Sequence, residues 1–187
     1  MSTDRQKSFI ANLSVDDRQL HFLEAFNGGP VYVAKPLFSG GVFTGRPPRI
    51  DHSHFLALRT HTSADPIDLL TIYFRHTSHG YTLYIRTPGQ YYGKCLGSDK
   101  GKIGALRSEE SSTFNLINKD HCPINLDCIE EDTTTIFLQV KNSGLIHAHN
   151  VHDSGHTYIG DKGGTPLSFK LNILQRNAPY INHPDEV

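Results

Sequence analysis

The sequence predicts an all-β protein of about twelve short strands. Apolar and polar residues alternate along most of the chain, which is the period of a strand with one buried face. No segment combines helical periodicity with capping residues, and 16 glycines and 10 prolines indicate many turns. Because 187 residues fit one domain, we expect the whole chain, residues 1–187, to share a single core.

Three strand–turn–strand segments recur along the chain. Residues 8–26 contain two apolar stretches around the turn SVDD. Residues 69–87 contain LLTIYFR and YTLYIRT, joined by HTSHG, in which Gly80 suits a tight hairpin turn. Residues 134–150 place KNSG between TTIFLQV and LIHAHN. The sequence therefore predicts three hairpins.

A closing strand with a phenylalanine follows each hairpin, in HFLAL, TFNLI and SFKLN. These phenylalanines, Phe55, Phe114 and Phe169, are 59 and then 55 positions apart. A glycine-rich turn precedes each closing strand, as in GQYYGKCLGSDKGKIGAL. The chain thus divides into three copies with two insertions: the copies are 8–62, 67–120 and 134–176, and the insertions are 35–54 and 118–132.

Three copies of a unit with four strands resemble a β-trefoil, over about residues 8–176. One such unit cannot cover its own apolar face and edges, whereas three units around an axis cover both. The resemblance implies pseudo-threefold symmetry, with a closed barrel capped by hairpins and the three phenylalanines meeting in its core. A β-sandwich is the alternative, because strands with similar spacing also build that fold.

The net charge and the N-terminal sequence limit the expected classes of partner and the expected cellular location. Lys and Arg number 18 against 19 Asp and Glu, so no bulk charge favours nucleic acid or an anionic membrane. The N-terminus has no apolar signal region, and no apolar run is long enough to span a bilayer. The three cysteines lack CxxC spacing, which fits a reducing compartment. We expect a soluble protein that is cytoplasmic, or exported without an N-terminal signal.

Sequence motifs give no reason to expect catalysis or a cofactor. HExxH, Walker A and GxSxG signatures are absent. The run DSGH at 153–156 contains three residue types of a catalytic triad, but a triad requires spatial geometry and not adjacency. We therefore expect a non-enzymatic binding module without a cofactor.

Known β-trefoils suggest two kinds of ligand. Ricin-type lectins carry Gln-x-Trp, and this chain has no Trp, but other lectins build sugar sites from Tyr, His, Asn and Asp. YYGKCLGSDKGKIGAL is similar to the corresponding turns of fascin-like and growth-factor-like units. The resemblance implies a lectin-like module with a glycan or glycoprotein as its partner. The alternative is a protein-binding trefoil that recognises actin or another cytoskeletal partner, or inhibits a protease through 35–54 or 118–132.

A sugar site needs an aromatic face together with polar groups that bond the hydroxyls. Two groups of residues meet this need in sequence: Tyr91 or Tyr92 with Asp99, and Tyr158 with Asn150, Asp153 and Asp161. The alternative for each tyrosine is a half-buried strand residue that covers the barrel.

Histidine is unusually frequent, with 12 residues. In HAHNVHDSGH, His147 and His149 alternate on a strand and face the same side, and His152 follows in the next loop. Two imidazoles and a third from a loop can bind Zn²⁺ or Ni²⁺. The alternative is a polar outer strand that carries surface imidazoles. A ligand site that uses neutral imidazole should weaken as the pH falls from about 7.5 to 5.5.

Overall fold

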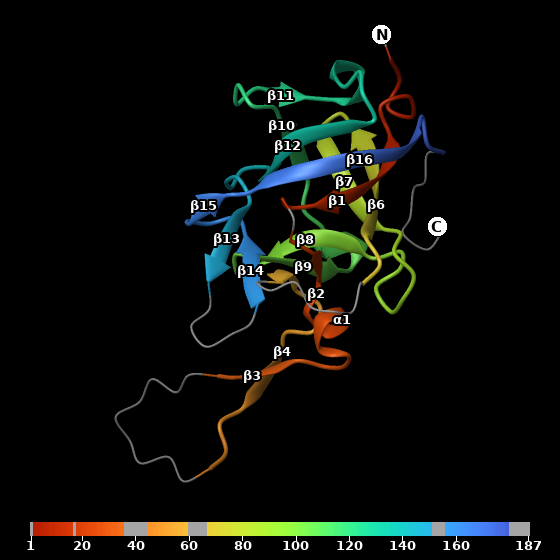
Figure 1. Cartoon of the computed structure of the whole chain (residues 1–187). Helices are drawn as coiled ribbons and strands as arrows, with labels where there is room; N and C mark the ends of the chain where they lie inside the picture. Colours follow the sequence, from red (N-terminus) through yellow and green to blue (C-terminus); the bar gives the residue numbers. More distant parts are fainter. Residues whose placement is uncertain (1, 17, 36–44, 60–66, 151–155, 180–187) are drawn as a thin grey trace.

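A computed structural model describes residues 2–16, 18–35, 45–59, 67–150 and 156–179 (Figure 1). The described part is mainly β, as the alternating sequence predicts, and it has one short α-helix. Its largest unit is an antiparallel sheet of nine strands in the order β11-β10-β12-β16-β1-β6-β7-β8-β9. A sheet of five strands and a sheet of two strands complete the fold.

Six strands of the large sheet pair in a closed circuit. Going round it, β1 pairs with β6, β6 with β7, β7 with β10, β10 with β12, β12 with β16, and β16 again with β1. The strands are β1 (Phe9–Ser14), β6 (Leu70–Thr77), β7 (Gly80–Ile85), β10 (Phe114–Ile117), β12 (Thr133–Val140) and β16 (Ser168–Arg176). Because the circuit closes, each of these strands has a neighbour on both sides. We call these six strands the ring.

Three further strand pairs are inserted between ring strands along the chain. They are β2 (Leu20–Phe22) with β5 (Leu56–Arg59), β8 (Cys95–Asp99) with β9 (Lys102–Leu106), and β13 (His147–Asn150) with β14 (His156–Gly160). β14 also pairs with β5, so the first and third pairs share the sheet of five strands together with β15 (Thr165–Pro166). β8 continues the large sheet from β7 through the pair Tyr84 and Cys95.

The remaining elements are short. β3 (Tyr32–Ala34) and β4 (Arg49–Asp51) form the two-stranded sheet, and β11 (Pro123–Ile124) borders β10. β4 begins directly after Pro47 and Pro48, which cannot donate to a strand ladder. The helices are α1 (Leu23–Asn27) and the 3₁₀ turns η1 (Ser108–Glu110) and η2 (Leu126–Cys128). Within the described residues, no helix has the length and apolar character needed to cross a membrane.

The predicted hairpin at 69–87 is confirmed as β6 and β7. Gly80 closes it with a φ of +125°, where a β-carbon would lie 2.6 Å from the carbonyl oxygen of Phe114. Only glycine avoids both the backbone strain and this overlap. The turn residue therefore also lets β7 approach β10.

The predicted hairpin at 8–26 is wrong, and the one at 134–150 is confirmed only next to its turn. β1 pairs with β16 and β6, and only an isolated bridge links Val15 to Arg18 near the expected turn. After β12 the chain turns back, with a bridge between Gln139 and Leu145 and a hydrogen bond of 2.8 Å from the N–H of Ile146 to the carbonyl of Leu138, but β13 itself pairs with β14 and β15. Alternation identifies a strand but not its partner, and distant strands supply the pairing here. In addition, LEAF folds into α1, because Leu23 and Phe26 share one buried helical face.

The core divides into one main cluster and two smaller ones. Phe114 and Phe169 are fully buried in the main cluster, as predicted. Phe55 is buried in a second cluster with Leu23, Phe26, Ala57 and Tyr158, so the expectation that all three phenylalanines meet is wrong. The physical reason is that Phe55 precedes β5, which pairs with β2 and β14 and lies outside the ring. Inside the main cluster, Phe9 stacks on Phe74 at 4.5 Å between ring centroids.

Candidate functional site

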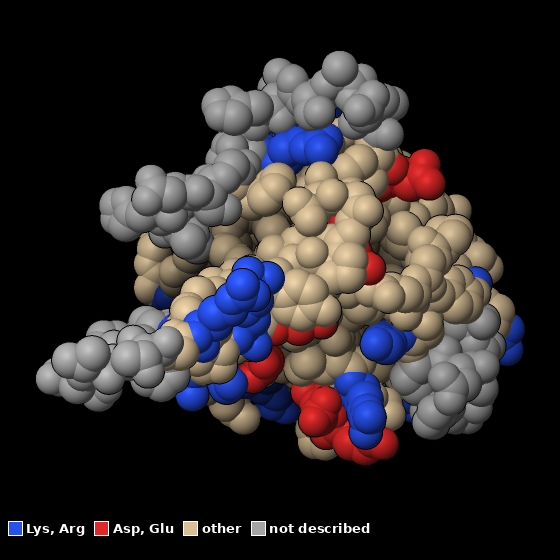
Figure 2. All heavy atoms as spheres, turned by 90° about the horizontal axis from the view of Figure 1, so that it is seen from below, with Lys and Arg blue, Asp and Glu red and all other residues tan. Residues whose placement is uncertain are grey.

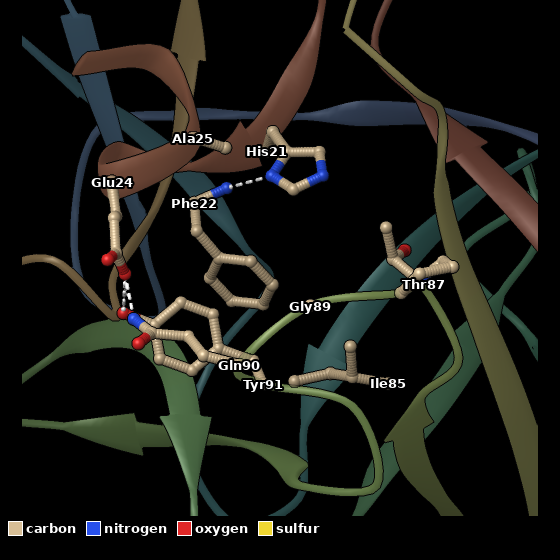
Figure 3. Close-up of a pocket in the computed structure, with 10 residues that line it drawn as sticks. His21, Phe22, Glu24, Ala25, Ile85, Thr87, Gly89, Gln90 and Tyr91 are labelled. Carbon is tan, nitrogen blue, oxygen red and sulfur yellow. Dashed lines mark hydrogen bonds between the residues drawn. The ribbon is translucent and has the colours of Figure 1, made fainter. Parts of the chain in front are cut away.

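A cavity of about 290 Å³ lies between the β2–α1 segment and the loop that follows β7 (Figure 3). We call it the His21 cavity. β2 and the start of α1 supply one wall, and the end of β7 with the following loop supplies the other. The lining residues are His21, Phe22, Glu24, Ala25, Ile85, Thr87, Pro88, Gly89, Gln90 and Tyr91. Two segments far apart in sequence thus combine apolar and polar groups at one hollow.

An aromatic pair lies at one side of the cavity. The rings of Phe22 and Tyr91 are 4.6 Å apart between centroids and tilted by 52°. Phe22 is almost fully buried and anchors Tyr91, which is only partly buried. The ammonium group of Lys94 lies 5.2 Å from the centroid of the Tyr91 ring, within cation–π range. Tyr91 is therefore held on two sides and still reaches the cavity.

A carboxylate is fixed beside this ring. The hydroxyl of Tyr91 donates to Oε2 of Glu24 at 2.7 Å, and Nε2 of Gln90 donates to the same oxygen (Figure 3). Burial raises the pKa of Tyr91, and the adjacent Glu24 carboxylate raises it further. The phenol therefore stays protonated and donates at neutral pH. Both of these donors bond to Oε2, which leaves Oε1 of Glu24 as the acceptor that a ligand can use.

The imidazole of His21 provides a neutral donor. The backbone N–H of Phe22 donates to Nδ1 of His21 at 2.9 Å, so this nitrogen carries no proton. Burial lowers the pKa of His21, against a smaller opposing effect of Asp68. The proton of the neutral ring therefore lies on Nε2, on the side toward Thr87 in Figure 3. Thr87 is itself occupied, because its hydroxyl accepts from the N–H of Thr71 at 2.7 Å.

A second cavity, of about 400 Å³, shares Gln90 and Tyr91 with the first. Its character is different, because charged and titratable side chains dominate the lining. The other residues that line it are Asp51, His54, Lys94, Ala105, Leu106, Arg107 and Glu110. Burial lowers the pKa of His54, which favours the neutral ring. Tyr91 thus separates an apolar hollow from a charged one.

The first predicted sugar group is only partly brought together. Tyr91 lines both cavities. Tyr92 is 42% exposed and contacts the guanidinium of Arg86 at 5.9 Å from its ring centroid, and it lines neither cavity. Asp99 ends β8, opposite Lys102, and also lies outside both linings. The two tyrosines lie in a turn, in which the N–H of Tyr92 donates to the carbonyl of Gly89 at 3.1 Å, and only Tyr91 faces the hollow.

The described members of the second predicted sugar group line neither of these two cavities. Tyr158 is buried, and its hydroxyl forms a hydrogen bond with Nδ1 of His52 at 3.0 Å. It therefore packs as a strand residue, which was the alternative to a sugar-binding role. Asp161 is also buried, and its N–H donates to the carbonyl of Gly101 at 3.3 Å. Asn150 ends β13 opposite Thr157, and Asp153 lies outside the described residues.

Two of the three predicted metal ligands lie within the described residues, and the third does not. His147 and His149 both lie on β13, opposite Gly160 and Tyr158, while His152 lies outside the described residues. Among the residues that the structure describes, no three His, Cys, Asp or Glu side chains gather in a metal-binding group. Nδ1 of His147 and Nε2 of His149 are buried without a described hydrogen-bond partner.

Sequence reasoning missed His21, Glu24 and Gln90. Glu24 lies in the short helix that was expected to be strand, so its neighbours could not be assigned. Gln90 lies in the glycine-rich segment GQYYGKCLGSDKGKIGAL that the sequence singles out, directly before Tyr91, but its amide was not proposed as a site group. The two segments meet through the hydrogen bonds of Glu24 with Gln90 and Tyr91, which are separated from it by 66 and 67 positions in the sequence. No local sequence pattern reveals such contacts.

Comparison of the chain with protein-family models, with curated proteins and with solved structures finds no match.

Proposed function

We propose that the protein is a single β-trefoil that binds carbohydrate without catalysis, through the His21 cavity. The order of elements supports the fold assignment, because a ring strand, an inserted strand pair and a second ring strand occur three times. The copies are β1 to β6, β7 to β10, and β12 to β16, which shifts the boundaries from those expected from the sequence. A closed circuit of six strands favours this fold over a sandwich, whose two sheets keep open edges.

The observation that carries the ligand proposal is the Glu24 carboxylate fixed beside the Tyr91 ring. A pyranose offers an apolar C–H face and a set of hydroxyls that both donate and accept. The Tyr91 ring suits the apolar face, Oε1 of Glu24 accepts from a hydroxyl, and Nε2–H of His21 donates to one. Because Tyr91 and Gln90 hold Glu24 before a ligand arrives, little side-chain entropy is lost on binding.

The lining of the cavity favours binding over hydrolysis. Most glycosidases use two carboxyl groups that flank the scissile bond. Among the described residues that line the His21 cavity, Glu24 is the single carboxylate. Oε2 of Glu24 already accepts hydrogen bonds from Tyr91 and Gln90, which suits a carboxylate that positions a ligand hydroxyl.

A glycan array probed with the full chain, followed by calorimetry on the best ligand, tests the proposal. We expect Glu24→Gln and Tyr91→Phe to weaken binding by about tenfold or more, since a hydrogen bond to a charged group is worth roughly 1.5–3 kcal/mol. Tyr92→Phe is the matched control, because this neighbouring tyrosine lines neither cavity. An array without binding, or equal losses for Tyr91→Phe and Tyr92→Phe, would contradict the proposal.

A protein-binding role is the second candidate, and the exposed β3–β4 hairpin favours it. This hairpin lies within and beside the 35–54 segment that the sequence singles out. Co-sedimentation with actin filaments and inhibition assays against a protease panel test the two forms of this candidate. Binding that survives Glu24→Gln would separate such a partner from the glycan.

A further inference from the structure

The β3–β4 hairpin projects away from the rest of the molecule (Figure 1). Every residue of β3 and β4 is exposed. Tyr32, Val33 and Ile50 are 55%, 38% and 40% exposed, and they account for half of the large hydrophobic residues that the described surface exposes. Exposed apolar residues gathered on one element indicate an interaction site more often than scattered ones do.

The outer edge of β3 carries backbone groups without partners. The N–H of Lys35 donates to the carbonyl of Pro48, and the N–H of His52 donates to the carbonyl of Val31, both at 2.8 Å. The backbone groups of Val33 and Ile50, which lie between these two bonds, therefore also face each other. In an antiparallel pair the alternate residues point outward. The N–H and C=O groups of Tyr32 and Ala34 therefore face away from β4, and no described backbone group pairs with them.

The β4 edge is less suited to pairing. Pro47 precedes Pro48 at the start of this strand and has no N–H to offer an added strand. The hairpin thus has one open edge, β3, and one edge that proline blocks in part. This asymmetry favours a single added strand next to β3.

Packing within the fold does not explain the apolar surface of the hairpin. Its attachment comes from Val31, which packs on the second core cluster and donates its N–H to the hydroxyl of Ser53 at 2.8 Å. A two-stranded ribbon of three residues per strand is marginal in water by itself. Burial of Val33 and Ile50 against a partner would supply what the fold does not.

The charge of the hairpin selects the partner. Lys35, Arg46 and Arg49 are exposed, and none forms an ion pair with a carboxylate of the described residues. The opposing Asp51 is engaged, because it accepts the N–H of Ser53 at 2.8 Å. Figure 2 views the molecule from below and shows groups of both signs on that face.

We propose that the β3–β4 hairpin binds an extended, acidic segment of a partner protein, which adds to β3 as a further strand. Backbone pairing with Tyr32 and Ala34 supplies the register. Val33 lies next to the added strand on one face of the sheet, with Ile50 beyond it on β4, and Arg49 lies opposite Ala34, on the face that carries Tyr32. A membrane is disfavoured as the occupant, because outward-pointing backbone groups remain unsatisfied in lipid. This site is independent of the His21 cavity.

Selection of random short peptides displayed on phage against the full chain tests the proposal. We expect enriched peptides to combine Asp or Glu with β-branched residues at alternate positions. For the best peptide, measured by fluorescence anisotropy, Val33→Asp and Arg49→Glu should each weaken binding by about tenfold or more. Leu174→Asp is the matched control, because Leu174 is also an exposed apolar residue but lies on β16.

A chemical variant of the peptide tests strand addition directly. N-methylation removes a backbone donor, and in a strand only every second N–H points toward the neighbouring strand. Two peptides, one methylated at the odd and one at the even positions, should therefore differ: one should lose binding and the other should bind nearly as the parent peptide does. The proposal is overturned if no selected peptide depends on Val33 and Arg49, or if both methylated peptides bind equally. It is also overturned if Val33→Asp abolishes self-association in sedimentation velocity, or if phosphatidylserine vesicles bind the hairpin more tightly than any peptide.

Discussion

The ring and the β3–β4 hairpin are both built from antiparallel strands, but they differ in what covers them. Phe9, Ala11 and Leu13 alternate along β1 and are buried against the other ring strands. Val33 and Ile50 face each other across the hairpin in the same manner and remain exposed. Similar local patterns therefore lead to a stable core in one region and to an uncovered surface in the other. The difference separates the residues that hold the fold from those available for recognition.

The strongest way to break this comparison is to open the ring. Phe114 is fully buried and connects β10 to β7 and β12. We expect Phe114→Ala to lower the free energy of unfolding by about 3–5 kcal/mol, through lost burial and the cavity that remains. Guanidinium denaturation measures this, with Val33→Ala in the hairpin as the control. A loss below about 1 kcal/mol at Phe114 would contradict the assignment of the ring as the stable region.

The contact between two inserted strand pairs gives the next largest effect. A β-carbon at Gly160 would lie 2.0 Å from the carbonyl oxygen of Gly101, so β14 would have to move away from the β8–β9 turn. We expect Gly160→Ala to cost about 1–3 kcal/mol, as overpacking does elsewhere. At Gly29 a β-carbon meets nothing within 4 Å, so Gly29→Ala should be nearly neutral. Equal stabilities of the two variants in thermal unfolding would disprove this contact.

Acid should weaken the fold through its buried histidines. Burial lowers the pKa of His21, His52, His54 and His156 below the ordinary value of 6.5. Between pH 6.5 and the lower pKa values of the folded state, the unfolded chain binds more protons than the native one. The contribution of these histidines to stability is therefore complete above pH 6.5 and falls as the pH drops toward the folded pKa values. Each histidine contributes at most about 1.4 kcal/mol per pH unit.

Denaturation midpoints between pH 7.5 and 5.5 measure this dependence. His21→Gln should reduce the slope, whereas His79→Gln, at an exposed turn, should leave it unchanged. A midpoint that does not vary with pH would exclude the buried neutral histidines as the cause.

A smaller effect is expected where all three inserted pairs meet. The ammonium group of Lys102 on β9 lies 4.8 Å from the ring centroid of Tyr158 on β14 and 5.2 Å from that of Phe55, next to β5. Lys102→Met keeps the length of the side chain and removes its charge, and should cost about 0.5–1 kcal/mol. Lys100→Met, at an exposed position in the same turn, is the control. Identical unfolding curves for the two variants would remove Lys102 from the account of stability.

Polar substitution in the hairpin should change stability least. Val33→Asp touches no described core cluster, and we expect a change within about 0.5 kcal/mol in urea denaturation. The same variant is expected to lose peptide binding, so stability and recognition respond separately. Unfolding of Val33→Asp under conditions where the wild type is folded would show that the hairpin belongs to the core.

The sequence predicts strands well and their partners poorly. Alternation correctly identifies segments such as β6 and β7, where Gly80 also marks the turn. Phe55 was expected beside Phe114, because the same phenylalanine pattern precedes β5 and occurs in β10. Which strand enters the ring depends on pairings between distant segments, and a local pattern does not contain them.

The candidate site shows the same limit. Tyr91 was predicted as the aromatic face of a sugar site and lines the cavity, whereas its neighbour Tyr92 does not. His21 and Glu24 lie on β2 and α1, whereas Tyr91 follows β7, so their meeting depends on how distant segments pack. Residue types suitable for sugar recognition can thus be listed from the sequence, but their assembly requires the fold.

Amide hydrogen exchange of the full chain, resolved by residue, tests the contrast between the two regions most directly. If the six paired strands carry the stability, their amides exchange slowest, and those of Tyr32 and Ala34 exchange within the dead time of the experiment. Slow exchange at Tyr32 and Ala34, equal to that of Phe9 or Leu138, would contradict the account.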